Sequence, residues 1–154
     1  MSMKQIRLLL AVLALILFTI NIKAQTVKTD DIVGKWFTEN NDAKVEIYKS
    51  GNKYYGRIVQ LKEPNDKVTG KPKTDKNNPD ANMHSKPIIG MILMSGFEFD
   101  GKKQWENGTI YDAKSGKTYN CYINLESKDK MKVRGYIGKA WMGIGRTTYW
   151  VRTK

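Results

Sequence analysis

The feature that most constrains the fold is the spacing of apolar residues from about residue 33 onward. Apolar and polar residues alternate in short runs, and turn-forming residues separate the runs. A period of two is typical of half-buried β-strands, and we find no convincing amphipathic helix over the same stretch. The pattern predicts eight strands: Val33–Glu39, Ala43–Lys49, Lys53–Lys62, a strand from near Pro87 to Phe99, Lys103–Asp112, Lys117–Glu126, Lys130–Gly138 and Arg146–Arg152.

Two stretches within this pattern allow a second interpretation. The pair Asn107-Gly108 is a strong hairpin signal. We interpret it as a bulge inside the strand 103–112, because too few residues separate it from the turn at Asp100-Gly101. If it is a hairpin, the number of strands rises. The apolar run "IIGMILM" at residues 88–94 also suits a short buried helix, since seven residues are too few to distinguish the two periods.

Eight antiparallel strands in one small domain either close into a barrel or pack as a sandwich. Successive short turns favour an up-and-down barrel, and closure removes the unpaired edges. The three tight connections, at Ser50–Asn52, Asp100-Gly101 and Ser127–Asp129, fall at one end. The long connections, Glu63–Lys86 and Lys139–Gly145, fall at the other end. The sequence therefore predicts a cup whose interior holds side chains or one small ligand.

An even number of strands places the end of the last strand beside the start of the first. Arg152 should then lie near Trp36, at the closed end of the barrel. A guanidinium stacked on an indole is a favourable contact. Gly34 would let the chain bend there without a Cβ clash. We therefore expect Gly34, Trp36 and Arg152 to close the barrel structurally.

Residues 1–24 have the character of a secretory signal peptide. Lys4 and Arg7 precede the apolar run Leu8–Ile20, and "NIKA" follows. The run is shorter than the roughly twenty residues of a membrane span. We expect cleavage near Ala24, a single domain over residues 25–154, and a periplasmic or secreted protein that is not an integral membrane protein. An uncleaved anchor is the alternative.

The chain is strongly basic, with 27 Lys and Arg against 15 Asp and Glu. Three of the basic residues precede residue 25, so the remainder carries a charge of about +9. Such a surface is attracted to anionic partners such as the cell envelope, although a lysine-coated surface also serves solubility alone. Basic and aromatic residues interleave in "KYYGRIV" and "RTTYWVR". That is seen in nucleic-acid binders, but also in half-buried sheets, and the export signal argues against nucleic acid.

Few residues can carry chemistry. Cys121 and His84 are the only cysteine and histidine, so neither a disulfide within the chain nor a zinc site is expected, and no cofactor. Cys121 shares a predicted strand face with apolar residues and should be buried. No nucleophile elbow, phosphate loop or dinucleotide motif follows the leader. A hydrolase would need paired carboxylates, for which Asp80, Glu106 and Asp112 are the candidates.

Two loops carry the candidate ligand contacts at the mouth. The connection Glu63–Lys86 is long and polar, and its "NNPD" suits an ordered turn, whereas its lysine-rich first half suits a mobile stretch. The segment "GKAWMGIG" places apolar residues among glycines, which suits an adaptable rim for a ligand or a membrane. The alternatives are a plain surface loop for the first, and strand continuations into the core for the second. The candidates are Asn78, Asp80, His84, Trp141, Met142 and Ile144.

Larger blocks of the chain carry a family resemblance. A Gly-x-Trp on the first strand with an Arg on the last resembles the calycins, which are the lipocalins and their relatives. The blocks "DIVGKWFTENNDAKVEIYKSGNKYYGRIVQLKEP", "NNPD", "KPIIGMILMSGFEFDGKKQWENGTIYDAKSGKTYNCYINLE" and "MKVRGYIG…GRTTYWVR", in this order, resemble an exported bacterial family called domain of unknown function 2147. The resemblance implies a small lipocalin-like barrel that is secreted or periplasmic, and it implies no catalytic residues. The stretch "ANMHSK" departs from the family's pattern, with Lys86 where an Arg is expected.

The sequence as a whole favours an all-β, eight-stranded, lipocalin-like barrel. Our first hypothesis for its function is non-enzymatic binding of a small apolar or amphipathic ligand in the envelope. One alternative is a cationic protein with a filled barrel that docks on envelope polymer or on a protein partner. A hydrolase with a carboxylate pair is the other.

Overall fold

The computed structural model describes residue 3 and residues 26–153. The predicted signal peptide, apart from Met3, and the predicted cleavage site lie outside the described residues. None of the helices among the described residues reaches the length and apolarity of a membrane span.

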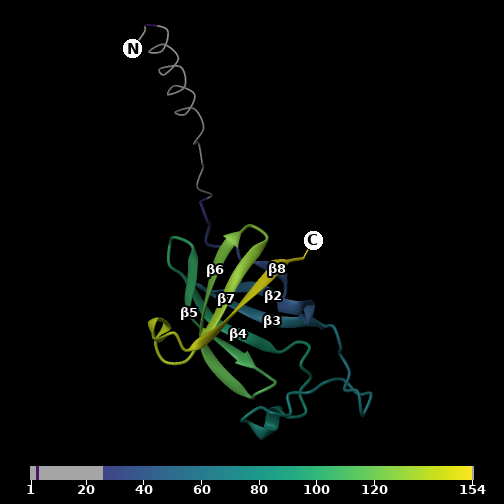
Figure 1. Cartoon of the computed structure of the whole chain (residues 1–154). Helices are drawn as coiled ribbons and strands as arrows, with labels where there is room; N and C mark the ends of the chain where they lie inside the picture. Colours follow the sequence, from purple (N-terminus) through teal and green to yellow (C-terminus); the bar gives the residue numbers. More distant parts are fainter. Residues whose placement is uncertain (1–2, 4–25, 154) are drawn as a thin grey trace.

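Eight antiparallel strands close into one barrel in sequence order, which confirms the predicted all-β, up-and-down architecture (Figure 1). Each strand pairs with its neighbours in the chain, and the first pairs with the last. The strands are β1 (Gly34–Phe37), β2 (Ala43–Ser50), β3 (Lys53–Leu61), β4 (Ile92–Phe99), β5 (Gln104–Asp112), β6 (Lys117–Ser127), β7 (Lys130–Tyr136) and β8 (Gly145–Arg152). Three short 3₁₀ helices lie in the connections: η1 (Glu39–Asn41), η2 (Ala81–Met83) and η3 (Ala140–Met142).

The fourth strand is shorter than the alternation predicts. It begins at Ile92 rather than near Pro87, and the run "IIGMILM" is not a helix either. Gly90 takes a positive φ of 96° and turns the chain, while its N–H donates to the carbonyl of Ile58 at 2.7 Å. The apolar run therefore divides into a turn, of which Ile88 is buried and Ile89 exposed, and the first residues of β4. The turn is hydrogen-bonded to Ile58 of β3.

Asn107-Gly108 forms a bulge, as predicted, and β5 continues through it. Asn107 has a φ of +61°, and the register with β6 shifts between Trp105 and Gly108. The ring of Phe97 lies directly on Gly108, so that a Cβ there would come within 2.4 Å of it. Glycine at this position makes room for a large core side chain from the neighbouring strand.

One half of the barrel is filled by its own side chains. These residues are all less than about a tenth exposed and come from every strand: Trp36, Val45, Ile47, Tyr54, Met94, Phe97, Trp105, Cys121, Ile123, Met131, Val133 and Trp150. Three aromatic rings meet at its centre, since Trp105 contacts both Tyr54 and Phe99. This packing fills the interior of the barrel towards the end where the tight turns lie.

The segment before β1 crosses this end and seals it. Ile32 is fully buried, and its carbonyl accepts a hydrogen bond from the indole of Trp36 at 2.9 Å. The indole of Trp105 donates to the carbonyl of Thr29 at 3.0 Å. We call this segment before β1 the plug. The indole N–H groups of Trp36 and Trp105 thus both bond to its backbone, because a buried indole N–H needs a hydrogen-bond acceptor.

Arg152 joins the plug to the barrel. Its guanidinium lies 4.2 Å from the centre of the fully buried Trp36 ring. It also donates to three carbonyls, those of Lys128, Val33 and Asp31. Trp36 and Arg152 are direct register partners on β1 and β8, as the even number of strands requires.

Candidate ligand-binding site

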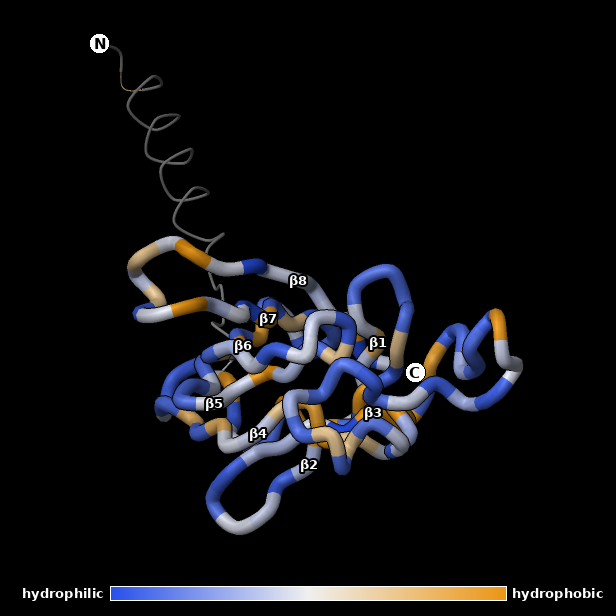
Figure 2. The backbone as a smooth tube through the Cα atoms, turned by 90° about the horizontal axis from the view of Figure 1, so that it is seen from below, coloured by the Kyte–Doolittle hydropathy of each residue, from blue (hydrophilic) through white to orange (hydrophobic). Residues whose placement is uncertain are grey.

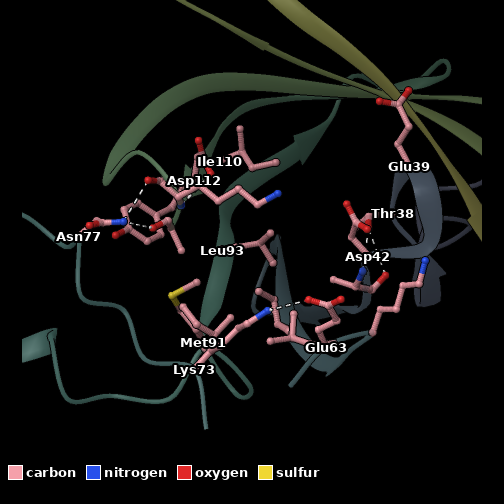
Figure 3. A pocket seen from close by; sticks show the side chains of 18 of the residues that line it. Thr38, Glu39, Asp42, Glu63, Lys73, Asn77, Met91, Leu93, Ile110 and Asp112 are labelled. Atoms are coloured by element: carbon pink, nitrogen blue, oxygen red, sulfur yellow. Dashed lines mark hydrogen bonds and ion pairs between the residues drawn. The ribbon is translucent and has the colours of Figure 1, made fainter. Parts of the chain in front are cut away.

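The opposite half of the barrel contains an open cavity of about 1450 Å³. It lies at the end with the long connections, and side chains from opposite walls point into it (Figure 3). Met91, just before β4, and Leu93, on β4, reach in from one wall together with Ile110 of β5. Thr38 and Asp42 lie across from them, in the β1–β2 connection. The cavity therefore stands between the sealed core and solvent.

The walls of the cavity are mainly apolar. They comprise Ile58, Leu61, Ile88, Met91, Leu93, Ile110, Tyr111, Tyr119, Val133, Ile137 and Trp150. Leu61, Met91, Leu93 and Ile110 are only partly buried although they pack against the core. Gly135 on β7 also lines the cavity, and a Cβ there would be in ordinary contact with Ile110. These side chains line a space that the protein itself leaves open.

The rim of the cavity carries charges of both signs. Its basic residues are Lys62, Lys71, Lys73, Lys76, Lys114 and Arg146, and its acidic residues are Glu39, Asp42, Glu63, Asp66 and Asp112. Glu63 pairs with Lys67 at 3.2 Å and with Lys73 at 3.7 Å. The hydrogen bond from Lys67 is the main reason that the pKa of Glu63 lies below its usual value. A ligand therefore meets a polar entrance and an apolar interior.

The long β3–β4 connection forms a tethered flap beside this rim, and Asp75 is its anchor. Asp75 is 1% exposed and is the one buried charged residue among the described residues. Its carboxylate accepts hydrogen bonds from the Tyr111 hydroxyl and from the Asn78 amide, both at 2.7 Å. Burial, and secondly the bond to Asp75, raise the pKa of Tyr111 to about 12. A buried carboxylate needs such partners, so Asp75 fixes the flap to β5.

Asn77 makes a second attachment of the flap. Its side-chain amide donates to the carbonyls of Ala113 at 3.3 Å and Lys114 at 3.0 Å, in the β5–β6 turn. Gly116 in the same turn has a φ of +69°, and a Cβ there would come within 2.0 Å of the Asn77 carbonyl. The first half of the connection is folded too, since Asp66 accepts bonds from the N–H groups of Val68 and Thr69.

The predicted contacts Asn78, Asp80 and His84 come together in the flap, but none of them lines the cavity. The Asn78 side chain accepts from the Asp80 N–H at 2.9 Å. Asp80 caps η2 by accepting from the N–H of Asn82. The His84 ring nitrogen Nε2 lies 2.7 Å from the carbonyl of Asn78. These side chains are engaged in forming the turn around "NNPD".

The other three candidates, Trp141, Met142 and Ile144, lie in the β7–β8 loop and also lie outside the cavity lining. They do not continue the strands into the core, because β7 ends at Tyr136 and η3 intervenes. Trp141 is 80% exposed. The loop projects as a separate lobe beside the barrel when the molecule is viewed from below (Figure 2). Of its neighbours, Ile137 and Gly145 do line the cavity.

The candidate hydrolytic carboxylates are not gathered at the cavity. Asp112 lines it, but its oxygens accept from the Lys114 N–H and the Ser115 hydroxyl. Glu106 accepts from Gln104 at 2.9 Å and pairs in register with Glu98, and Asp80 belongs to the flap. Within the described residues no three His, Cys, Asp or Glu side chains lie close enough to hold a metal ion. Burial raises the pKa of Cys121 to about 12, so this cysteine is not poised as a nucleophile.

Sequence reasoning missed the anchor Asp75 and the cavity wall itself. The wall residues Leu61, Ile110 and Val133 lie on predicted strands. The alternation of apolar and polar residues predicts which side chains of a strand point into the barrel. Alternation does not say whether an inward side chain meets a partner or an open space. Asp75 gave no signal, because an acid among lysines in a polar loop is usually exposed.

A closed eight-stranded barrel with one sealed end and an apolar cavity at the other is the architecture of the lipocalin-like proteins. The chain belongs to the bacterial family described as "Uncharacterized protein conserved in bacteria (DUF2147)", which matches residues 34–152. Among solved structures it is similar to protein HP1028 from Helicobacter pylori, described as belonging to the lipocalin family. The TM-score is 0.69 at 23% identity, over 80% of this chain and 83% of that one. No curated protein matches the chain.

Proposed function

We propose that this protein is an exported, non-enzymatic binding protein that holds a small apolar or amphipathic molecule in its barrel. The observation that carries the proposal is the division of the barrel into a filled half and an open half. A protein that used the barrel only as a scaffold would gain stability by filling the second half as it fills the first.

The apolar wall supports a ligand with an apolar body. Leu61, Leu93 and Ile110 expose part of their side chains to the cavity. Removing apolar surface from water contributes about 25 cal/mol per Å², so a ligand that covers these walls is held without directional contacts. Small-molecule sites usually measure ~300–1,000 Å³. The cavity of about 1450 Å³, which includes its mouth, is large enough for such a molecule.

The charged rim supports an amphipathic ligand over a wholly apolar one. Lys62, Lys71 and Lys114 line the cavity. Lys73 lines it too and forms an ion pair with Glu63. A polar or ionised end of the ligand would lie among these groups and remain partly in water. The leader of residues 1–24 supports export, since its charged start and short apolar run match a secretory signal.

The test pairs two neighbouring substitutions on β4. Leu93→Trp places an indole in the cavity, whereas Ile92→Trp places the same group at a position that is 49% exposed and outside the cavity lining. We expect the Leu93→Trp variant to lose most binding of an apolar fluorescent probe such as N-phenyl-1-naphthylamine. The Ile92→Trp variant should bind the probe like the wild type.

Native mass spectrometry of protein purified from its own periplasm should show a bound small molecule that the Leu93→Trp variant lacks. Repeated absence of a bound molecule, together with equal probe binding by both variants, would rule the proposal out. Recovery of the protein from the cytoplasm with its leader intact would contradict the exported compartment.

A further inference from the structure

The tip of the β7–β8 hairpin is an exposed apolar surface on an ordered loop. The apolar tip, as we call it, comprises Ile137, Trp141, Met142 and Ile144, which are 58%, 80%, 48% and 55% exposed. The loop is held in shape from within, because the Ile137 N–H donates to the Ile144 carbonyl at 3.0 Å. The Arg134 guanidinium donates to the Gly143 carbonyl at 3.1 Å. A fixed loop that keeps large apolar side chains in water is characteristic of an interaction site.

The hairpin that carries the apolar tip is wholly without acidic residues. Asp129 is the last acid of the chain, and every charged residue after it is basic. The described ones are Lys130, Lys132, Arg134, Lys139, Arg146 and Arg152. Lys139 lies inside the loop, next to η3. Lys130 pairs with Glu126 at the sealed end of the hairpin, and Arg146 pairs with Glu39 beside the loop. The charged side chains of the hairpin nearest the tip are Arg134, Lys139 and Arg146, all basic, which complements an anionic surface.

Tyrosines accompany these cations on neighbouring strands. The Lys130 ammonium lies 4.5 Å from the Tyr149 ring, and the Lys132 ammonium lies 5.8 Å from the Tyr122 ring. The Tyr122 ring in turn lies 6.1 Å from that of Tyr136. Tyr and Trp concentrate at membrane–water interfaces, and lysines reach anionic headgroups from the same depth. Of these residues Tyr136, at the end of β7, is next to the loop, whereas Lys130 begins β7 at the sealed end.

The apolar tip lies at the open end of the barrel. Ile137 and Arg146, at the two sides of the loop, line the cavity mouth. In Figure 1 this loop lies at the left of the barrel and the β3–β4 flap at its lower right, and residues from both connections line the same cavity. In Figure 2 the loop beside β8 carries apolar segments, coloured orange, on its path. A surface that receives the tip therefore also comes close to the mouth.

We propose that the β7–β8 hairpin docks the protein on an anionic lipid bilayer. Trp141 and Ile144 enter the boundary between headgroups and acyl chains, while Lys139 contacts anionic headgroups. A bilayer accepts such side chains without a shaped pocket, and binding gains from both buried apolar area and charge attraction. This inference goes beyond the binding function, because docking does not require an occupied cavity.

The experiment measures co-sedimentation with vesicles. We use protein processed by its own export pathway, and mass spectrometry establishes that all variants share one N-terminus, so any contribution of residues 1–25 cancels. The vesicles contain either phosphatidylglycerol with phosphatidylcholine or phosphatidylcholine alone. We expect binding to the anionic vesicles, weaker binding to the neutral ones, and weakening by salt.

The matched variants distinguish vesicle binding through the apolar tip from nonspecific adsorption of the protein. The double variant Trp141→Ser/Ile144→Ser should lower the affinity for anionic vesicles by about tenfold or more. Val151→Ser changes a residue that is 45% exposed at the sealed end, and it should bind like the wild type. Lys139→Gln should lower the affinity roughly fivefold, the usual effect of one cation near an anionic surface.

Trp141 also serves as a built-in reporter. The tryptophans at 36, 105 and 150 are at most 3% exposed, so the solvent-accessible fluorescence comes from Trp141. Anionic vesicles should shift its emission to shorter wavelength and protect it from acrylamide. Equal binding by the double variant, equal binding to neutral vesicles, or binding to soluble dextran sulfate with no change in Trp141 would overturn the proposal. A stable dimer that the double variant abolishes would overturn it as well, in favour of a second copy.

Discussion

At the scale of single residues, the contact among Gly34, Trp36 and Arg152 shows why a short motif can be informative. The Arg152 guanidinium covers the buried indole at 4.2 Å and donates to three backbone carbonyls. Gly34 has a φ of +135°, and a Cβ there would come within 2.7 Å of Arg152 Nη1. Two features therefore require glycine at this position: the positive φ of the backbone and the close approach of the Arg152 guanidinium. The motif seals the end of the barrel and takes no part in the cavity.

This packing predicts an energetic coupling between Gly34 and Arg152. Arg152→Ala should lower the free energy of unfolding by about 2–4 kcal/mol, since it removes the stacking and leaves carbonyls without their donor. Gly34→Ala alone should cost about 1–3 kcal/mol, from backbone strain and the clash. In the Arg152→Ala background the same change should cost less, because only the strain remains. Urea denaturation of the four proteins measures the cycle. Strict additivity would show that the clash is relieved elsewhere.

At the scale of elements, β5 shows how one strand accommodates its neighbour. The bulge at Asn107 adds one residue on β5, and it coincides with the place where the Phe97 ring of β4 covers the backbone of Gly108. A bulge increases the local twist of a strand and helps a sheet to close. The composition of Asn107-Gly108 is typical of a hairpin turn. In this barrel, however, the pair curves the sheet and makes room for the core side chain of Phe97.

Two adjacent substitutions distinguish these roles. Gly108→Ala should destabilise the protein by about 1–3 kcal/mol, because the added methyl group collides with a buried ring. Asn107→Gly should change stability by no more than about 0.5 kcal/mol, because glycine adopts a positive φ readily and the bond lost, to Glu98, is at the surface. Chemical denaturation checks both. Equal effects of the two changes would contradict the assigned packing.

The flap of residues 63–86 is the second element whose behaviour depends on one contact. Its long polar sequence suggested a stretch that is partly mobile, yet the buried Asp75 fastens it to Tyr111 and Asn78. The flap can therefore shape the cavity rim.

This contact predicts a specific pH dependence. Burial and the hydrogen bond to Asp75 raise the pKa of Tyr111 to about 12 in the folded protein, above its ordinary value of 10.0. The stabilisation is therefore fully present below pH 10 and is lost as the pH rises towards 12. Tyr111→Phe should cost roughly 1–3 kcal/mol at pH 8, by leaving a buried carboxylate oxygen without its donor. The cost should shrink above pH 10.

Urea midpoints measured from pH 8 to 12 test this dependence. The control is Tyr149→Phe, at a position that is 41% exposed, and we expect no such trend for it. A cost for Tyr111→Phe that stays constant across this range would mean that the tyrosine acts through packing rather than through its hydroxyl.

At the scale of the whole molecule, the two ends of the barrel differ in what they are built to do. The plugged end holds Trp36, Trp105 and Arg152. The open end holds the cavity, the tethered flap and the apolar tip. The residues that seal the barrel are thus separated along its axis from the cavity and the loops around its mouth. The proposed bilayer contact and the proposed ligand site share this end.

The eight-strand pattern, the barrel, the bulge and the pairing of Trp36 with Arg152 could all be predicted from the sequence. They follow from local properties, namely the period of two, the turn residues and the parity of the strand number. The start of β4 was missed because Gly90 turns the chain inside a continuous apolar run, which periodicity cannot divide. The candidates Asn78, Asp80 and His84 were chosen as ligand contacts because they lie in the long loop, but their side chains hydrogen-bond within that loop and do not line the cavity.

What the sequence determined by itself is therefore the class of fold and which end is tight, because alternation and turn chemistry act between neighbouring residues. The tertiary structure alone decided that one half of the barrel is filled and the other open, since that depends on how side chains from eight strands meet. It also decided that Asp75 is buried and that Trp141 is not. Burial is a property of the whole assembly, and the local sequence around each of these two residues suggests the opposite.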